Sequence, residues 1–284
     1  MFVFAWMFVA LLIVPSSWAE EVFQEYCNNS LCHCFVAPVR REGQPILIEG
    51  DIAIDNDAER NADPCTSYGC MWGKWSDGKV YVPYYIANHF CKYQHSDREK
   101  SIITRGLESF SSFSCIRFRP TISNDRDWLS IESQDGCWSY VGRRGGKQVV
   151  SLARSGCLYH NTVQHELLHA LGFNHEQTRS DRDNHIRVLL ENVISGMEHN
   201  FRKIATLNQG TPYDYGSVMQ YFRTAFSKNG QPTMIPIPDP NVSLGNAQQM
   251  SSNDIKRLNT LYQCCECYSH NQDTLHQAYS TGSD

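Results

Sequence analysis

The run from His165 to Glu176, with the sequence HELLHALGFNHE, constrains this chain more than any other feature. His165 and His169 are four residues apart, and on an α-helix this spacing places both imidazoles on one face, one turn apart. Gly172 can adopt the left-handed conformation that ends a helix, so that the chain turns and His175 joins the pair. Three neutral imidazoles leave one coordination position of a zinc ion open, as in catalytic rather than structural sites. We therefore predict one zinc ion per chain.

Glu166 follows the first of these histidines and lies within reach of a water molecule at the metal, which makes it the candidate general base. A surface helix that merely carries histidines is the alternative. The bare HExxH match leaves that alternative open, whereas Gly172 and His175 complete the extended signature of metzincin peptidases. That signature also places a methionine in a tight turn downstream, and the segment SVMQY at 217–221 fits it. An ordinary loop with a buried methionine is the alternative there.

The start of the chain is typical of an exported protein. Residues 1–14 form an apolar run too short to span a bilayer, and Ala19 ends a motif of small residues that suits signal peptidase. We predict a signal peptide over 1–19, with an uncleaved anchor as the alternative. Twelve cysteines in an exported chain indicate disulfides, and a cysteine zinc cluster around 32–34 or 264–267 is the competing interpretation.

Charge and composition divide the rest of the chain. A net charge of −5 over 284 residues is too mild to indicate nucleic acid or an anionic membrane, so neither is expected as a partner. Residues 20–60 end in a polar stretch suited to proteolysis. Within them Gly50 could let Asp51 reach a metal, with a surface turn as the alternative. We predict one catalytic domain over 61–267 and a disordered polar tail over 268–284.

Hydrophobic periodicity places the elements of that domain. Pro83 limits the first strand to an edge or a strand end, because proline lacks an N–H. The last strand, at 148–152, could lie at an edge and pair with an extended peptide substrate. Asn161 or Thr162 is expected to cap the zinc helix. The predicted strands are 79–85, 114–118, 128–132 and 148–152, and the predicted helices are 97–114, the zinc-binding run and 185–204.

From about Asn61 to Cys264 the chain resembles the astacin family of zinc endopeptidases, whose signature continues with a glutamate at the position of Glu176. Within the family it looks most like the six-cysteine hatching enzymes of fish, the choriolysin type. The resemblance implies an α+β metzincin fold of two subdomains. The N-terminal half would hold a mixed five-stranded sheet and two long helices, including the zinc helix, and the C-terminal half would be irregular. The supporting stretches are 135–137, 145–152, 176–183, 211–215 and 223–227.

The resemblance also implies catalytic roles for single residues. Glu166 would be the general base. Tyr221 would contact the zinc in the resting enzyme and then stabilise the tetrahedral intermediate, and Met219 would lie in the turn below the metal. The zinc ligands would be His165, His169 and His175.

Further implied roles concern activation of a zymogen. Asp51 would take the place of water on the zinc before activation. Cleavage after Arg60, which suits a trypsin-like protease, would free Asn61 as a new N-terminus buried near Glu176.

The family pattern assigns some cysteines and leaves others open. The implied disulfides are Cys65–Cys70, Cys115–Cys264 and Cys137–Cys157. The cysteines without an assigned partner are Cys27, Cys32, Cys34, Cys91, Cys265 and Cys267. One departure is Gln220, where the family usually has histidine; because this position is not a zinc ligand, activity should survive. Asn241 opens a sequon for N-glycosylation.

Together these features predict a secreted, monomeric zinc endopeptidase made as a zymogen and stored in zymogen granules. It would hydrolyse protein substrates through a zinc-activated water, and the resemblance suggests egg envelope glycoproteins at hatching. Two alternatives stand beside this one. The first is a digestive or tissue proteinase of the same group, and the second is a secreted protein that binds other proteins through the cleft without cutting them.

Overall fold

The computed structural model describes residues 44–55, 69–88 and 96–264. Within those ranges every helix is too short or too polar to span a lipid bilayer. Several predictions lie outside the described residues: the signal peptide 1–19, the tail 268–284, Arg60, Asn61, Cys65 and the unassigned Cys27, Cys32, Cys34, Cys91, Cys265 and Cys267.

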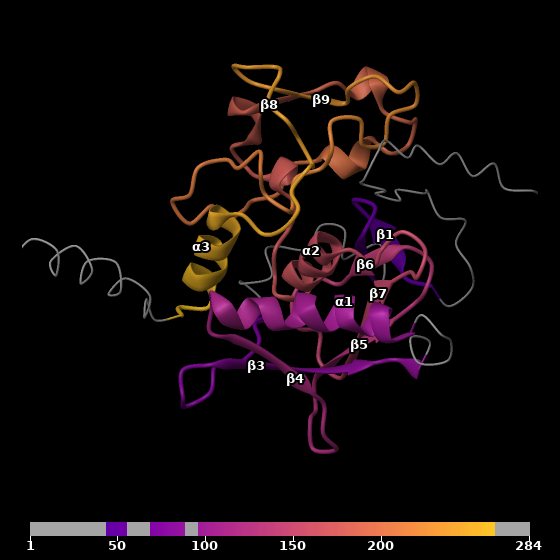
Figure 1. The fold of residues 1–284 in the computed structure, drawn as a ribbon. Helices are drawn as coiled ribbons and strands as arrows, with labels where there is room; N and C mark the ends of the chain where they lie inside the picture. The colour runs from indigo at the N-terminus through magenta and orange to yellow at the C-terminus, as the bar shows by residue number, and fades with distance from the viewer. Residues whose placement is uncertain (1–43, 56–68, 89–95, 265–284) are drawn as a thin grey trace, which may run out of the picture. The chain divides into compact units, whose positions relative to one another are not determined.

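A mixed sheet of seven strands forms the N-terminal half, in the order β1-β2-β6-β7-β5-β3-β4 (Figure 1). The strands β3, β4, β5 and β7 are mutually parallel, and β6 is antiparallel to β7. These five strands are the mixed sheet that was predicted, and a β1–β2 hairpin extends it beyond β6. The strands are β1 (Ile46–Ile48), β2 (Ile52–Ile54), β3 (Val80–Ile86), β4 (Ile116–Pro120), β5 (Trp128–Glu132), β6 (Cys137–Ser139) and β7 (Lys147–Leu152).

Two predicted edge positions are wrong. β3 lies between β4 and β5, and Pro83 is accommodated because pairing with β5 begins only at Tyr84. β7 is paired on both sides, by β5 and by β6, so it cannot receive a substrate strand. The strand between β7 and the hairpin, β6, was not predicted, because three residues are too few to show an alternating pattern.

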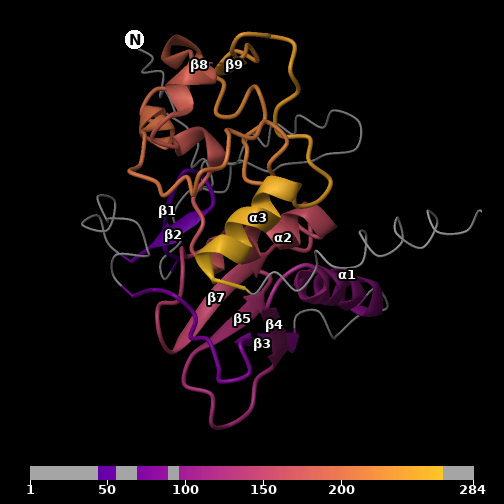
Figure 2. The same ribbon diagram turned by 90° about the vertical axis from the view of Figure 1, so that its left-hand side faces the viewer.

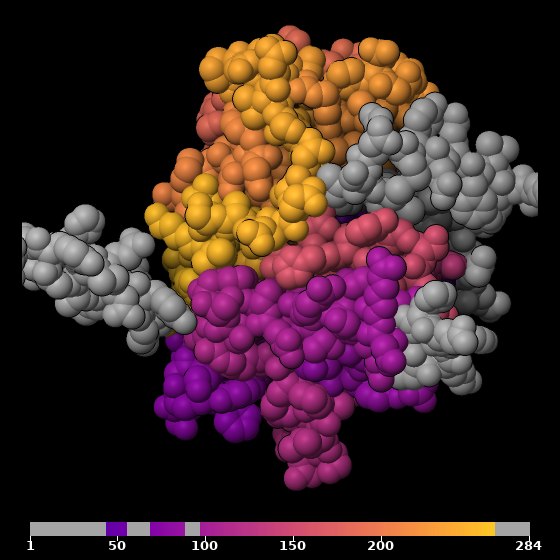
Figure 3. Space-filling model, viewed as in Figure 1, coloured from indigo at the N-terminus to yellow at the C-terminus, as the bar shows by residue number. Residues whose placement is uncertain are grey.

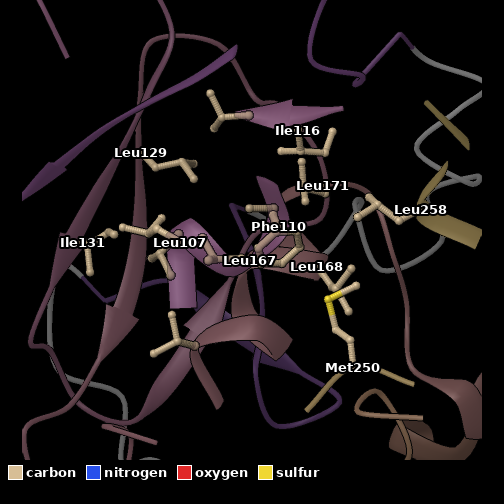
Figure 4. Close-up of a cluster of buried hydrophobic side chains, with 14 of the residues drawn as sticks. Leu107, Phe110, Ile116, Leu129, Ile131, Leu167, Leu168, Leu171, Met250 and Leu258 are labelled. Carbon is tan, nitrogen blue, oxygen red and sulfur yellow. The ribbon is translucent and has the colours of Figure 1, made fainter. Parts of the chain in front are cut away.

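Two helices pack side by side on the sheet and enclose the main core (Figures 1 and 4). They are α1 (Ser96–Ser109), continued by the 3₁₀ turn η4 (Phe110–Ser112), and α2 (His160–Ala170). Gly106 allows their close approach, because a Cβ there would lie 2.3 Å from Cγ1 of Val163. The core residues labelled in Figure 4 come from both helices, from the sheet and from the C-terminal part: Leu107, Phe110, Ile116, Leu129, Ile131, Leu167, Leu168, Leu171, Met250 and Leu258.

The C-terminal half is irregular, as predicted, and holds a smaller core of its own. The predicted helix at 185–204 is wrong: the only helical turns of the segment are isolated 3₁₀ turns, and two of its N–H groups donate to residues far away in the chain. The N–H of Leu189 donates to the carbonyl of Thr233 at 2.8 Å, and that of Ile194 donates to Phe226 at 2.9 Å. The segment instead forms β8 (Ile186–Val188), which pairs with β9 (Met234–Pro236), and the 3₁₀ turns η7 (Leu190–Asn192) and η8 (Glu198–Phe201).

A third helix, α3 (Ser252–Leu261), lies beside α2 and ties the C-terminal half to the main core (Figure 2). Ser251 and Asp254 form a reciprocal capping box at its start. Leu258 is fully buried against the core. This helix was not predicted, although the capping pair followed by apolar residues at helical spacing was a usable signal. In the space-filling view the yellow α3 region rests directly on the magenta α1 region (Figure 3).

Candidate metal centre

The helix α2 carries the zinc-binding run and is anchored at both ends. It begins at His160 with Tyr159 as an N-cap that makes no side-chain bond, so the predicted cap at Asn161 or Thr162 is wrong. The Asn161 amide instead donates to the carbonyl of Ala247 at 2.9 Å. At the other end Gly172 has φ = +104°, the left-handed conformation that was predicted.

Three imidazoles and one carboxylate converge below this helix. The His165 and His169 Nε2 atoms are 3.1 Å apart. Asp51 Oδ2 lies 3.0 Å from Nε2 of His165 and 3.1 Å from Nε2 of His175. One ligand atom from each of these four residues lies within 4.8 Å of all the others. Nitrogens around a tetrahedral zinc with bonds of about 2.0–2.1 Å are about 3.3 Å apart, so the cluster suits one zinc ion.

Each imidazole is oriented by a partner at its other nitrogen. Nδ1 of His165 lies 2.8 Å from the carbonyl of Val218, and Nδ1 of His169 lies 2.7 Å from the carbonyl of Phe173. For His175 the partner is a carboxylate oxygen of Glu49, at 2.7 Å. An N–H on Nδ1 leaves the lone pair on Nε2, so all three rings present a metal-binding nitrogen to the centre.

Two buried carboxylates behave differently beside these rings. Burial and the negative charge of Asp51 raise the pKa of Glu166 well above its usual value. Burial also opposes ionisation of Asp51, but the charge of His175 and its hydrogen bonds with His165 and His175 hold its pKa well below the usual range. Oδ1 of Asp51 and Oε2 of Glu166 are buried without a hydrogen-bond partner. A metal ion and a water molecule would satisfy these two oxygens, which supports the fit to zinc.

The turn around Met219 contacts His165 through the carbonyl of Val218 and is held by α3. Asp254 accepts hydrogen bonds from the hydroxyl of Ser217 at 2.6 Å and from the N–H of Val218 at 2.9 Å. The carbonyl of Met219 accepts from the N–H of Glu176 at 2.9 Å. The carbonyl of Val218 in this turn is the one that orients His165, so Asp254 supports a metal-binding histidine through the turn.

Tyr221 lies against the same cluster, with its ring centroid 4.5 Å from that of His175. Its hydroxyl donates to the main-chain carbonyl of Glu49. Burial, followed by the charges of Asp51 and Glu49, raises the pKa of Tyr221 well above its usual value, so the hydroxyl keeps its proton. The phenol is therefore a hydrogen-bond donor next to the metal centre.

Gln220 occupies the position at which the family usually has histidine. Both ends of its side-chain amide are hydrogen-bonded. Its Oε1 accepts from the hydroxyl of Tyr213 at 2.5 Å, and its Nε2 donates to the carbonyl of Tyr221 at 3.0 Å. Both Gln220 and Tyr213 are buried. The amide thus joins a buried tyrosine to the main chain of Tyr221.

Glu176 is the centre of a buried ion cluster rather than a metal-binding residue. Arg257 forms a bidentate pair with it at 2.6 and 3.0 Å, and Arg179 approaches to 3.3 Å. The N–H of Asp214 donates to the same carboxylate at 2.7 Å. A cavity of about 80 Å³ adjoins Glu176, Arg179 and Arg257.

Two disulfides close the framework around the site. Cys115, just before β4, is bonded to Cys264, which follows α3, and Cys137 in β6 is bonded to Cys157 before α2. These are two of the pairings that the resemblance implies. Cys70 is also disulfide-bonded, and its implied partner Cys65 lies outside the described residues.

Sequence reasoning missed several residues that surround the centre. Glu49 orients His175, and Asn200 accepts the N–H of Glu49 at 2.8 Å. Arg257 neutralises Glu176, and Asp254 holds the methionine turn. Only Asp254 had a sequence signal, since it is the third residue of a helix with a serine cap.

Three histidines that project to one point from a helix and the turn after it, beside a buried glutamate, define a zinc metallopeptidase site. Residues 70–263 match the profile of the Astacin peptidase family. The chain belongs to the astacin family, whose members act on protein substrates.

Named relatives agree with this assignment. The low choriolytic enzyme of Oryzias latipes is 47% identical over 220 residues, covering 77% of this chain and 78% of that protein. Zinc metalloproteinase nas-13 of Caenorhabditis elegans is 40% identical over 238 residues, covering 78% of this chain and 51% of that longer protein. The structure of high choriolytic enzyme 1, a hatching enzyme zinc-protease of Oryzias latipes, superposes with a TM-score of 0.67 at 45% identity, covering 72% of this chain and 100% of that one.

Proposed function

We propose that this astacin metalloprotease is made as a secreted zymogen and digests the egg envelope at hatching. The observation that supports an inactive precursor is the position of Asp51, whose carboxylate lies among the three histidines. The choriolytic names of two relatives support the substrate. A digestive or tissue role for the same catalytic domain is the alternative, because a relative without a choriolytic name, zinc metalloproteinase nas-13, is also 40% identical to this chain.

The geometry of the centre supports the proposed catalytic roles. His165, His169 and His175 would hold the metal, each with its Nδ1 already bonded to a partner. A zinc ion bound there lowers the pKa of water toward neutrality and polarises the scissile carbonyl. Glu166, which follows the first zinc-binding histidine, accepts the proton of the attacking water and delivers it to the leaving amine. The proton carried by the Tyr221 hydroxyl is then available for a hydrogen bond to the developing oxyanion.

Latency would come from the β1–β2 hairpin, which blocks the site in three ways. Asp51 occupies the centre between the histidines. The carbonyl of Asp51 accepts the N–H of Ser139 at 2.9 Å, and β2 pairs with β6 at Ile52, so the edge available to an extended substrate is covered. The hydroxyl of Tyr221 is held by the carbonyl of Glu49.

Processing would remove this hairpin. In the proposal residues 1–19 are a signal peptide, 20–60 a propeptide and 61–267 the catalytic domain. A trypsin-like protease cuts after Arg60. The cavity beside Glu176, which also adjoins Asp254, offers room for the new N-terminus at Asn61. Asn241 is exposed, which makes its sequon accessible to glycosylation in the secretory pathway.

The experiment measures zinc content and casein hydrolysis of the full chain before and after limited trypsin treatment, with and without phenanthroline. We expect one zinc per chain, activity only after trypsin, and complete loss with the chelator. Purified egg envelope is then compared with casein at equal enzyme concentration. Bound zinc without any cleavage would overturn the peptidase assignment for this chain, and cleavage of casein but not of egg envelope would favour the digestive or tissue role.

A further inference from the structure

The loop that follows β6 carries an arginine beside the hairpin that blocks the metal centre. The guanidinium of Arg144 donates to Oδ2 of Asp55 at 2.6 Å, and Asp55 directly follows β2. On the proposed function, processing removes Asp55 together with the hairpin, whereas Arg144 stays in the catalytic domain. The place of this carboxylate beside the guanidinium then opens to a carboxylate of another molecule.

Hydrogen bonds tie this loop to the metal centre. The N–H of Gly142 donates to the carbonyl of His169, a metal-binding residue, at 2.8 Å. The N–H of Arg144 donates to Oε1 of Gln148 at 2.9 Å, and Nε2 of Gln148 donates to the carbonyl of Gly142 at 2.8 Å. Gln148 lies buried in β7. The backbone that carries Arg144 therefore has a set position relative to the histidines.

The side chain of Arg144 is oriented and still accessible. Its guanidinium carbon lies 5.3 Å from the ring centroid of Tyr140, within the range of a cation–π contact. The side chain is 34% exposed even with the hairpin in place, so a carboxylate from solution can reach it. The neighbouring Arg143 differs, because it bonds to Asp127 at 2.7 Å and to the carbonyl of Met71 at 3.0 Å.

The direction of β6 indicates which part of a substrate would lie near Arg144. β6 begins at Cys137, which lines the same cavity as Glu166, and the chain then continues to Tyr140 and Arg144. On the proposed function Glu166 delivers a proton to the leaving amine, so the residues after the scissile bond would lie toward Cys137. The residues before the scissile bond would then lie toward Arg144.

The hairpin also indicates the distance along such a substrate. The carboxylate of Asp51 lies at the metal centre, and its carbonyl accepts the N–H of Ser139 at 2.9 Å. Asp55 is four residues further along, at the end of β2. Because an extended chain advances about 3.3 Å per residue, Asp55 is about 13 Å from Asp51 along the strand. An extended substrate at the same edge of β6 would bring its third to fifth residue before the scissile bond to Arg144.

We propose that Arg144 determines specificity by binding an acidic side chain three to five residues before the scissile bond. This inference rests on the proposed function, in which an extended substrate replaces the hairpin along β6. A guanidinium and a carboxylate match in charge and in hydrogen-bond geometry, and Asp55 already occupies this place with a carboxylate. Aspartate or glutamate at this position should therefore be preferred over asparagine and lysine.

The first test uses the trypsin-activated full chain after the trypsin has been inhibited. Matched peptides that lack arginine and lysine carry either aspartate or asparagine at each position before the scissile bond in turn. We expect kcat/KM for aspartate to exceed that for asparagine by about two- to fivefold at one of the third to fifth positions, as for an exposed ion pair. This ratio should approach one in salt of about 1 M, because the screening length is then about 3 Å.

Two negative results of this test have different meanings. Cleavage with an aspartate-to-asparagine ratio of one at the third, fourth and fifth positions would overturn the role of Arg144. A ratio that salt leaves unchanged would also overturn it, because an exposed ion pair is screened. No cleavage of any peptide would instead contradict the proposed function.

Replacement of Arg144 provides the second test. Arg144→Gln should reduce the ratio to one, and Arg144→Lys, which keeps the charge, should retain part of the preference. Arg144→Glu should reverse it, so that lysine is preferred over aspartate at the same position. Arg126→Gln, at an exposed arginine between β4 and β5, is the matched control and should keep the parent ratio.

Zinc content and a melting curve show whether each variant is folded. An unchanged ratio in Arg144→Gln, or an equal loss in Arg126→Gln, would overturn the assignment. If Arg144→Gln does not fold, the salt dependence of the ratio in the parent chain and the charge reversal in Arg144→Glu provide the same decision.

Discussion

The carboxylate of Glu49 lies 2.7 Å from Nδ1 of His175, so a residue of the β1–β2 turn orients a metal-binding histidine from behind. His165 and His169 are oriented by main-chain carbonyls of the catalytic domain itself. Glu49 is in the left-handed conformation with φ = +53°, and its N–H donates to Asn200 at 2.8 Å. The hairpin therefore contacts the centre through two residues. Asp51 lies among the Nε2 atoms of the histidines, and Glu49 binds the opposite nitrogen of His175.

Replacement of Glu49 by alanine should weaken zinc binding in the unprocessed chain. Loss of such an outer partner typically costs about 10–100-fold in metal affinity. We expect zinc transfer to phenanthroline to be faster by a similar factor, measured by absorbance of the chelate. Glu49→Gln retains an acceptor oxygen and should show a smaller effect. Equal rates in the parent and in Glu49→Ala would refute the supporting role of this carboxylate.

Replacement of Asp51 by alanine should give activity before trypsin treatment. An interaction with a charged group contributes about 1.5–3 kcal/mol, so the fraction of open site should rise about 10–100-fold. The measurement is casein hydrolysis by the intact chain, with gel analysis to verify that it stays uncut. Asp55→Ala is the matched control, because Asp55 lies in the same segment and pairs with Arg144 at the surface. A silent Asp51→Ala variant would count against the switch.

Replacement of Glu166 by glutamine should leave zinc content unchanged and remove peptidase activity. General acid–base catalysis typically contributes about 10²–10⁴-fold, and we expect kcat to fall by at least this factor. Zinc is measured by atomic absorption and kcat with a fluorogenic peptide after trypsin activation. Glu108→Gln, at an exposed position of α1, is the control. Near-full turnover by Glu166→Gln would contradict the assignment of the base.

The zinc helix could be predicted because its signal is local. The spacing of His165, His169 and His175, together with Gly172, specifies a helix, its end and the return of the chain within one short run. The strands β4, β5 and β7 could be predicted because each shows a run of β-forming residues. Their order in the sheet could not be predicted from such runs, because it depends on which strands pair.

The parts that were missed depend on partners far away in the chain. Glu49 and His175 are 126 residues apart, and Arg257 and Glu176 are 81 residues apart, so no sequence period connects them. The segment 185–204 has apolar residues at a spacing compatible with a helix. The N–H groups of Leu189 and Ile194 nevertheless donate to Thr233 and Phe226, and these tertiary hydrogen bonds outweigh a weak local preference.

Replacement of Gln220 by leucine should destabilise the protein more than replacement by histidine. Leucine leaves the buried hydroxyl of Tyr213 without its acceptor, which costs about 1–3 kcal/mol. Each kcal/mol lowers Tm by about 2–4 °C in a domain of this size. Histidine can accept the same hydrogen bond, so Gln220→His should keep a Tm close to that of the parent. Equal Tm losses in both variants would show that the hydrogen bond is unimportant.

The ion pair of Asp125 with Arg119 should contribute a pH-dependent part of stability. Hydrogen bonds from Arg119 lower the pKa of Asp125 to about 2, below the value of about 3.9 in an unfolded chain. A depressed carboxylate pKa stabilises the fold above about pH 4, and this contribution is lost as the pH falls toward 2.

Asp125→Asn should therefore lower Tm at pH 6, by about 2–4 °C for an effect near 1 kcal/mol. The difference from the parent should shrink as the pH falls from 4 to 2, as followed by circular dichroism. Glu191→Gln, which changes an exposed carboxylate of η7, is the control and should show no such pH dependence. A Tm difference that stays constant between pH 6 and pH 2 would refute the titration of Asp125.

Because β1 and β2 belong to the same chain as β6, the hairpin reaches the metal centre without a second molecule. Short flexible connections between two binding groups typically give an effective concentration on the order of millimolar. A hairpin of only micromolar intrinsic affinity would then occupy the site almost all the time while the chain is intact. After a single cut the same hairpin would be diluted to the concentration of the enzyme itself and would leave. On this proposal, latency would depend on connectivity rather than on tight binding, and one hydrolysed peptide bond would be sufficient to end it.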